Sequence, residues 1–137
     1  MERKANIGPA MFDLAISETS QQIVREFYES SKVVAAVCHG PAALVNVKLS
    51  DGTYLIAGQG TTGLSNTEEK IAGAMAGMPF SLEDALKGIV AMLICSRLQL
   101  NPFGPKVVVS GKTGNLITGQ NPASAGPIAE AMLKGIK

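Results

Sequence analysis

One short apolar run does most to constrain what this chain can fold into. Residues 33–37 read VVAAV, with no polar residue alternating among them. This pattern is typical of a strand buried on both faces, and such strands belong to parallel sheets covered by helices. Residues 38–41 (CHGP) follow directly; their glycine permits a tight turn and their proline suits the first position of a helix. The sequence therefore predicts that a strand, a sharp turn and a helix meet at Cys38.

The rest of the chain alternates between helix and strand signals. Thr19 and Gln22 form a capping box ahead of apolar residues at helical spacing, which predicts a helix over residues 20–31. Further helices are expected to open at Ser65 and Ser81 and to cover residues 128–133. Strands are expected over residues 54–57, 107–109 and 116–118, the last two joined by a turn at 111–115. Such alternation predicts an α/β fold.

Composition and length exclude several classes of function. Twelve Lys and Arg residues against eleven Asp and Glu residues give a net charge of +1, too little for a basic surface that binds nucleic acid or an anionic membrane. The longest apolar stretch, residues 88–100, is shorter than the roughly 20 residues that cross a bilayer, and we expect it to be a buried strand or helix. The charged N-terminus has no apolar region after it and is not expected to be a secretory signal. We expect one domain over residues 1–137, with no nucleic-acid or membrane partner.

Two glycine-rich segments resemble phosphate-binding loops only superficially. Residues 58–60 (GQG) and 111–114 (GKTG) match neither GxxxxGK[ST] nor GxGxxG between a strand and a helix. Turns are the better interpretation of both segments. We therefore expect no nucleotide cofactor, and the scattered methionines are expected to fill gaps in the core.

The two cysteines differ in their surroundings. Neither Cys38 nor Cys95 has CxxC or Cys/His ligand spacing, so we expect no metal site and no disulfide, which fits a reducing, intracellular location. Cys95 lies in an apolar run and is expected to be a core residue. The turn at Cys38 would project the thiol beyond the sheet, where a helix N-terminus and His39 would favour the thiolate. From the residues alone, a buried thiol beside a structural histidine is favoured over a reactive pair.

Four segments, in the same order, resemble one protein family. Residues 36–42 (AVCHGPA) are similar to the nucleophile elbow of the ThiJ/PfpI superfamily, which has the class I glutamine amidotransferase-like fold, and especially to its fungal glutathione-independent glyoxalase III-like branch. Further segments of that family resemble residues 11–14 (MFDL), Thr62-Gly63 followed by Glu68-Glu69, and residues 116–125 (LITGQNPASA). The resemblance implies a flavodoxin-like three-layer sandwich with a mostly parallel sheet.

The resemblance also implies an activity and the residues that carry it. Members of this branch convert a small 2-oxoaldehyde, methylglyoxal, with water to D-lactate as a hydro-lyase in a stress-related, cytoplasmic and sometimes nuclear role, without glutathione, metal or cofactor. By the family pattern Cys38 is the nucleophile, His39 its acid/base partner, and Glu69, or less well Glu68, the acid that orients His39. The thiolate would form a hemithioacetal and a base would then move a proton between the two carbons. The alternative for Glu69 is a solvated residue in the first turn of a helix, favoured by the helix dipole.

The chain departs from the family in ways that support a rival hypothesis. Family members carry opening strands with a glutamate that contacts the cysteine, so we expect an N-terminally truncated, partial domain in which residues 33–37 have an exposed edge or face. Residues 6–10 (NIGPA) replace a Gly-Gly-His-Gly loop, and Pro9 has no amide hydrogen to donate to an oxyanion. Residues 88–100 are apolar where the family is glycine- and charge-rich, and 112–115 resemble an insertion. The rival is an impaired paralogue that acts as a chaperone-like or redox-sensing protein, or a gene-model fragment; in either case a homodimer is compatible with the family.

Overall fold

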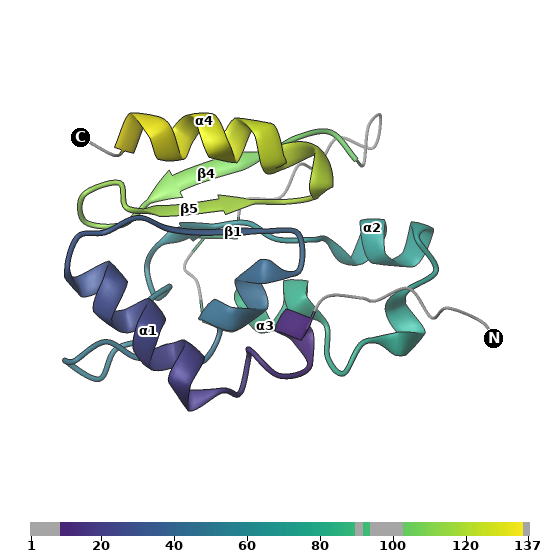
Figure 1. Cartoon of the computed structure of the whole chain (residues 1–137). Coiled ribbons are helices and arrows are strands. Elements are labelled where there is room, and N and C mark those ends of the chain that lie inside the picture. The colour runs from purple at the N-terminus through teal and green to yellow at the C-terminus, as the bar shows by residue number, and fades with distance from the viewer. Residues whose placement is uncertain (1–8, 90–91, 94–102, 136–137) are drawn as a thin grey trace.

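The chain forms three layers of helices and strands. The computed structural model describes residues 9–89, 92–93 and 103–135. Helix α4 covers one face of the sheet, and α1 and α3 lie on the other (Figure 1). The α-helices are α1 (Glu18–Glu29), α2 (Asn66–Ile71), α3 (Leu82–Lys87) and α4 (Ala125–Gly135), and the 3₁₀ helices are η1 (Pro9–Met11), η2 (Gly40–Leu44), η3 (Met75–Gly77) and η4 (Pro122–Ser124).

The described strands form two separate sheets, one mixed and one parallel. They are β1 (Val34–Val37), β2 (Gly60–Thr61), β3 (Met92–Leu93), β4 (Val107–Ser110) and β5 (Leu116–Gly119). One sheet has the order β1-β5-β4, in which β1 and β5 are parallel and β4 and β5 form an antiparallel hairpin; in the other, β2 and β3 are parallel. This layered arrangement of helices on a mostly parallel sheet confirms the predicted α/β fold class.

The hydrophobic core lies between the sheet and the layer that contains α1 and α3. Its fully buried side chains include Leu44, Leu55, Ile56, Leu86 and Leu116. On the opposite face, Gly119 lets α4 approach β5 closely, because a Cβ atom there would lie 3.1 Å from Cγ1 of Ile128 in α4. Both layers therefore pack directly against β5, the central strand of its sheet.

Several predicted local features are confirmed. The side-chain oxygens of Ser65 and Ser81 cap α2 and α3, as their positions in the sequence predicted. The β4–β5 turn contains Gly111 and Gly114, with φ of 89° and 73°, values that glycine adopts without steric cost. Helix α4 contains the predicted residues 128–133 but begins earlier.

Two predicted boundaries are wrong. Helix α1 begins at Glu18 because Ser17 accepts a hydrogen bond from the amide of Ser20, whereas the predicted cap, Thr19, lies in the first turn. The strand predicted over residues 54–57 is a series of turns with one isolated bridge, Lys48 to Tyr54. Leu55 and Ile56 are buried and anchor this loop in the core. A short apolar run does not distinguish such a loop from a strand.

Strand β1 is less buried than its sequence predicted. Val34 is buried, but the other three residues of the strand are only half-buried. In the described part of the chain β1 pairs with β5 alone, so it forms an edge of its sheet. The prediction of burial on both faces is thus wrong, and among the described residues β1 lies at an edge, as predicted. Cys95, residues 6–8 and most of the segment 88–100 lie outside the described residues.

Candidate active site

Cys38 occupies a strained turn at the carboxyl end of β1. Its φ is 62°, a left-handed conformation that is uncommon for residues other than glycine. The turn is held from two sides: the Cys38 amide donates to the Gly119 carbonyl at 2.9 Å, and the Cys38 carbonyl accepts from the Leu64 amide at 2.9 Å. Strained residues of this kind persist where the surrounding structure fixes them, and they occur preferentially at functional sites.

The helix that follows Cys38 is short. Residues Gly40–Leu44 form the 3₁₀ helix η2, with Pro41 in its first turn. Gly40 passes close to β1, since a Cβ atom there would lie 3.4 Å from Cβ of Ala36. The predicted strand, turn and helix are therefore present, but η2 is too short to give the macrodipole of a long α-helix.

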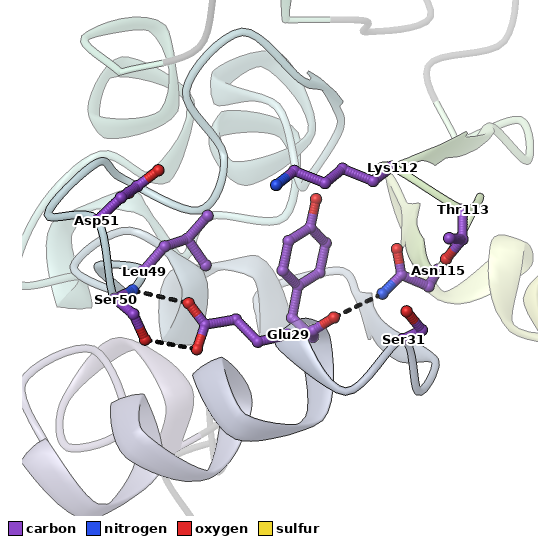
Figure 2. Close-up of a pocket in the computed structure, with 9 residues that line it drawn as sticks. Glu29, Ser31, Leu49, Ser50, Asp51, Lys112, Thr113 and Asn115 are labelled. Atoms are coloured by element: carbon purple, nitrogen blue, oxygen red, sulfur yellow. Dashed lines mark hydrogen bonds between the residues drawn. The ribbon is translucent and has the colours of Figure 1, made fainter.

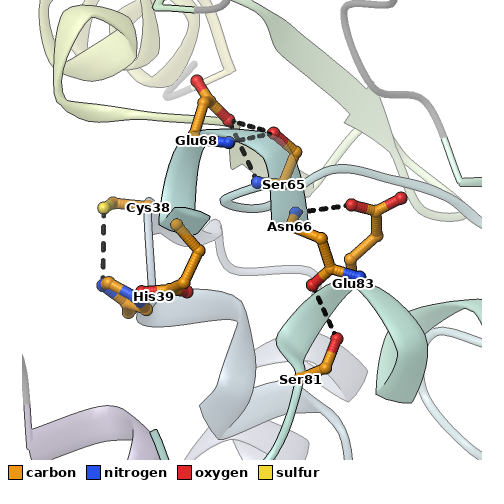
Figure 3. A network of polar contacts seen from close by, with 8 residues as sticks. Cys38, His39, Ser65, Asn66, Glu68, Ser81 and Glu83 are labelled. Atoms are coloured by element: carbon orange, nitrogen blue, oxygen red, sulfur yellow. Dashed lines mark hydrogen bonds and ion pairs between the residues drawn. The ribbon is translucent and has the colours of Figure 1, made fainter. Parts of the chain in front are cut away.

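The three predicted site residues lie within contact of one another. Nδ1 of His39 lies 3.6 Å from Sγ of Cys38, and Nε2 of His39 lies 3.0 Å and 3.1 Å from the two carboxyl oxygens of Glu69. Figure 3 shows the Cys38 thiol and the His39 ring facing each other beside α2. Consecutive side chains usually diverge, but the positive φ of Cys38 turns these two together. If Nε2 carries the proton that Glu69 accepts, Nδ1 is free to accept a proton from the thiol.

The capping of α2 places Glu69 beside His39. Ser65 and Glu68 form a capping box, in which each side chain accepts from the other's backbone amide. Glu69 follows one position later, and its side chain is only 6 % exposed. The interpretation of Glu69 as a solvated helix residue is therefore wrong.

Glu68 belongs to a different network. Its carboxyl group is fully buried and accepts four hydrogen bonds, from the Ser65 amide and hydroxyl and from the side-chain amides of Gln120 and Asn121, at 2.7–3.0 Å. The network ties α2 to the segment that follows β5. The geometry thus separates two neighbouring glutamates, one directed to His39 and one that joins two parts of the fold.

The sequence did not single out Gln120 and Asn121 as partners of Glu68. Both side chains are completely buried, and Asn121 also donates to the Gly104 carbonyl at 2.8 Å. They belong to the segment 116–125 that carried part of the family resemblance. The available signal for this network was a pair of polar residues directly after a predicted strand. It did not indicate their partner, because Glu68 lies 52 positions before Gln120.

Burial raises the pKa of the Cys38 thiol. Desolvation is the largest effect, and the carboxylates of Glu69 and Glu68 raise the pKa further, while a hydrogen bond from the His39 backbone amide lowers it. The expectation that a helix N-terminus and His39 would lower this pKa is therefore wrong. Formation of a thiolate at this position would therefore need a neighbouring base that accepts the proton.

Two cavities differ in their relation to this site. One of about 150 Å³ borders Glu69 and is lined by apolar side chains of Met75, Met78 and Phe80 together with Asn66 and Ser81. The other, of about 290 Å³, lies beside Ser31 and Asn115, which precede β1 and β5 (Figure 2). Cys38 follows the opposite end of β1, so the larger cavity is separate from the cysteine site. Among the described residues, no group of three His, Cys, Asp or Glu side chains is arranged to hold a metal ion.

Comparison with known proteins identifies the family. The model of the DJ-1/PfpI family matches residues 8–134. The chain belongs to the DJ-1/PfpI family. The resemblance of the elbow and of the three other segments to this family is thereby confirmed, and with it the flavodoxin-like fold.

The relatives of the chain within the DJ-1/PfpI family include proteins named as glyoxalases. It is 35% identical over 131 residues to "Probable glutathione-independent glyoxalase hsp3103" of Schizosaccharomyces pombe, covering 90% of this chain and 48% of the relative. It is 34% identical to the glutathione-independent glyoxalase HSP31 of Saccharomyces cerevisiae, covering 93% and 53%. The crystal structure of glyoxalase III from Candida albicans superposes with a TM-score of 0.79 at 28% identity, covering 93% and 53%. The chain thus spans about half the length of these relatives. In its described part, no helix is long and apolar enough to cross a membrane.

Proposed function

We propose that this chain is a glutathione-independent glyoxalase III-like lyase, which converts methylglyoxal and water to D-lactate with Cys38 as nucleophile. The observation that carries the proposal is the contact of one imidazole with both a thiol and a carboxylate, Cys38–His39–Glu69. This arrangement is that of a nucleophile, a base and a group that orients the base. The names of the relatives supply the substrate class.

The reaction uses the two ring nitrogens of His39 in different ways. Nδ1 takes the proton of the Cys38 thiol, and the sulfur adds to the aldehyde carbon of methylglyoxal to form a hemithioacetal. The base then removes the hydrogen from that carbon and returns a proton to the neighbouring carbon, so that the ketone becomes an alcohol and the hemithioacetal a thioester. Water hydrolyses the thioester, which releases lactate and restores the thiol. Glu69 holds Nε2 and stabilises the imidazolium that forms in each proton transfer.

A backbone donor lies beside the reacting sulfur. The His39 amide hydrogen-bonds to the Cys38 thiolate and favours it. In the adduct the same amide is placed to stabilise charge on the oxygen of the former aldehyde, which is the role of an oxyanion-hole donor. The turn that brings His39 and Cys38 together therefore serves both the nucleophile and the adduct.

A second candidate function is an impaired paralogue that acts as a chaperone-like or redox-sensing protein. The raised pKa of Cys38, whose charged neighbours are carboxylates, favours an impaired, chaperone-like paralogue; it does not favour a redox sensor, because oxidation of the sulfur requires the thiolate. A thiol of this kind reacts slowly unless His39 accepts its proton in the reaction itself. Turnover without glutathione distinguishes the two functions, since the impaired paralogue would give none.

Deuterium labelling tests the proposed path of the proton. Lactate formed in D₂O should carry solvent deuterium on the carbon next to the carboxylate, because His39 exchanges with water between the two transfers. The product is examined by ¹H NMR against lactate of known labelling. Complete retention of the substrate hydrogen on that carbon would indicate a direct hydride shift, and the role given to His39 would then be wrong.

We extend the proposal to a detoxifying role in stress, in the cytoplasm. Methylglyoxal is a reactive 2-oxoaldehyde, and a chain that needs no glutathione or metal could remove it when reduced thiols are depleted. Cells that lack the protein should grow more slowly in added methylglyoxal and recover with the wild-type chain but not with Cys38→Ala. Equal growth of all three strains would argue against this role.

A further inference from the structure

The residues at the end of β5 bind the elements that carry the candidate site. Three of the four consecutive residues 118–121 make such contacts. The Gly119 carbonyl accepts from the Cys38 amide at 2.9 Å, and the side chains of the last two residues donate to Glu68 in α2. Helix α2 also carries the carboxylate of the site. The end of β5 is therefore a common support for the thiol and for this carboxylate.

Thr118 joins β5 to the segment that follows β2. Its hydroxyl oxygen accepts a hydrogen bond from the Thr62 amide at 3.0 Å, and both residues are completely buried. Side chains alternate along a strand, so Thr118 lies on the opposite face of β5 from Gly119, which packs against α4. The bond thus connects β5 to residues 62–64 on the face that carries the core.

The segment 62–64 holds Cys38 from the side opposite Gly119. Two residues after Thr62, the Leu64 amide donates to the Cys38 carbonyl at 2.9 Å. Gly63 between them has little free space, since a Cβ atom there would lie 3.1 Å from a side chain of α3 and 3.5 Å from the Cys38 carbonyl oxygen. A displacement of residue 62 would therefore be passed to the hydrogen bond that fixes Cys38.

The hydroxyl group is what threonine adds at position 118. Valine has the same branched shape and suits a buried strand, and burying a hydroxyl costs free energy unless the hydroxyl is hydrogen-bonded. Thr61 in β2 shows the contrast, because it is also completely buried but its hydroxyl has no partner in the described part of the chain. At position 118 the hydroxyl satisfies a buried amide, which a valine would not do.

We propose that Thr118 is a positioning residue for the candidate site: it holds residues 62–64 so that Cys38 stays in the conformation that brings its thiol to His39. The φ of 62° at Cys38 is strained, and such strain persists only where the surrounding structure fixes it. Strand β5 supplies this constraint twice, directly through Gly119 and indirectly through Thr118. The consequence for turnover rests on the proposed function, whereas the consequence for the geometry of the site does not.

Threonine variants separate this role from a general effect on stability. Thr118→Val removes the hydroxyl at nearly constant volume, and Thr118→Ser keeps the hydroxyl and should preserve the bond. Thr61→Val is the matched control, since it makes the same change at a buried hydroxyl that has no partner among the described residues. Thr118→Ala removes the hydroxyl in a smaller side chain and gives the same test if the valine variant does not fold. Each variant is measured where urea unfolding shows it to be folded.

His39 provides a readout that needs no substrate, because it is the only histidine in the chain. In the neutral ring, Glu69 holds the proton on Nε2, and the ¹⁵N chemical shifts of the two ring nitrogens report this tautomer. His39 follows Cys38 directly and moves with the turn. Thr118→Val should therefore bring the two ¹⁵N shifts closer together, whereas Thr118→Ser and Thr61→Val should keep the wild-type spectrum. A loss of stability alone would leave the spectrum of the folded molecules unchanged.

Turnover of methylglyoxal provides the second readout. Thr118→Val should lower kcat by about tenfold to a hundredfold with a smaller change in KM, because a misplaced nucleophile affects the chemical step most. Thr118→Ser should recover most of this loss, and Thr61→Val should have a normal kcat. A wild-type ¹⁵N spectrum in folded Thr118→Val, or equal changes in Thr118→Val and Thr61→Val, would overturn the proposal. If the wild type forms no lactate, the proposed function is wrong, and the His39 spectrum alone decides the role of Thr118.

Discussion

Nε2 of His39 lies 3.0 Å from Oε1 of Glu69, although the two residues are 30 positions apart in the sequence. The opposite ring nitrogen lies 3.6 Å from the Cys38 sulfur, so one imidazole connects a thiol to a carboxylate. The contact depends on two local features, the positive φ of Cys38 and the capping box that opens α2. A substitution that disturbs either feature should therefore change the reactivity of Cys38 and leave the rest of the fold intact.

Replacing Glu69 by glutamine should reduce turnover far more than stability. The amide keeps the size of the side chain but does not stabilise an imidazolium, and the analogous change in a serine protease triad costs about 10⁴ in kcat. We expect Glu69→Gln to lower the kcat for methylglyoxal by about 10²–10⁴, with little change in KM. Steady-state kinetics with urea unfolding measures both quantities. A normal kcat in a folded variant would show that Glu69 does not position His39.

Glu68→Gln should show the opposite pattern. The buried carboxyl group accepts four hydrogen bonds, and a glutamine would direct an N–H donor toward at least one of its present donors. We expect the free energy of unfolding to fall by about 2–4 kcal/mol, from loss of charge-assisted bonds in a buried network. Urea denaturation compares the two glutamine variants directly. A Glu68→Gln protein as stable as the wild type would contradict the structural role of this residue.

Adjacent glutamates illustrate what the sequence could and could not predict. The capping-box pattern at Ser65 gave the start of α2 correctly, and the family pattern preferred Glu69 over Glu68 as the residue near His39. Burial of Glu68 by Gln120 and Asn121 could not be predicted, because it depends on a contact over more than 50 residues. Local signals specify caps and turns well, whereas partners of buried polar groups are set by the tertiary fold.

Close packing of β5 against α4 predicts a difference between two glycines. In Gly119→Ala the new methyl group would overlap Ile128 and lie 2.8 Å from Cβ of Ser124. We expect a loss of about 1–3 kcal/mol of stability from this overpacking. Gly126→Ala is the control within α4, where a Cβ atom has no neighbour within 4 Å and alanine favours the helix. Equal unfolding midpoints for the two variants would indicate that α4 does not contact β5 as described.

The raised pKa of Cys38 predicts slow alkylation at neutral pH. The rate of alkylation of Cys38 by iodoacetamide is followed by mass spectrometry in a Cys95→Ser background. This rate should increase with pH, and the midpoint of the increase should lie above the pKa of about 8.5 for free cysteine. The unfolded chain is the reference and should show the ordinary midpoint. Burial disfavours the thiolate in the folded state. The neutral Cys38 thiol therefore contributes stability that is present below the pKa of the unfolded chain and is lost as pH rises through the pKa of the folded chain. A folded-state midpoint below that of the unfolded chain would contradict this electrostatic description.

The Cys38 turn shows a second limit of sequence reasoning. The CHGP pattern gave the turn and the position of the nucleophile, because glycine and proline have strong local preferences. The same pattern gave the wrong direction for the pKa of Cys38, since it could not account for desolvation by the folded chain or for the placement of the two carboxylates. Position follows from local backbone preferences, but reactivity depends on burial.

The central claim is that Cys38, with His39 and Glu69, converts methylglyoxal to lactate. The most direct test is to incubate the purified chain with methylglyoxal in the absence of glutathione and to quantify D-lactate, after cooperative unfolding has shown that the chain is folded. Cys38→Ala is measured in parallel. Glu29→Gln is the control, because Glu29 lies by the cavity at the opposite end of β1 from Cys38. We predict D-lactate from the wild type and from Glu29→Gln, and none above the uncatalysed rate from Cys38→Ala. Lactate that persists in Cys38→Ala, or a folded wild type that forms none, would contradict the account.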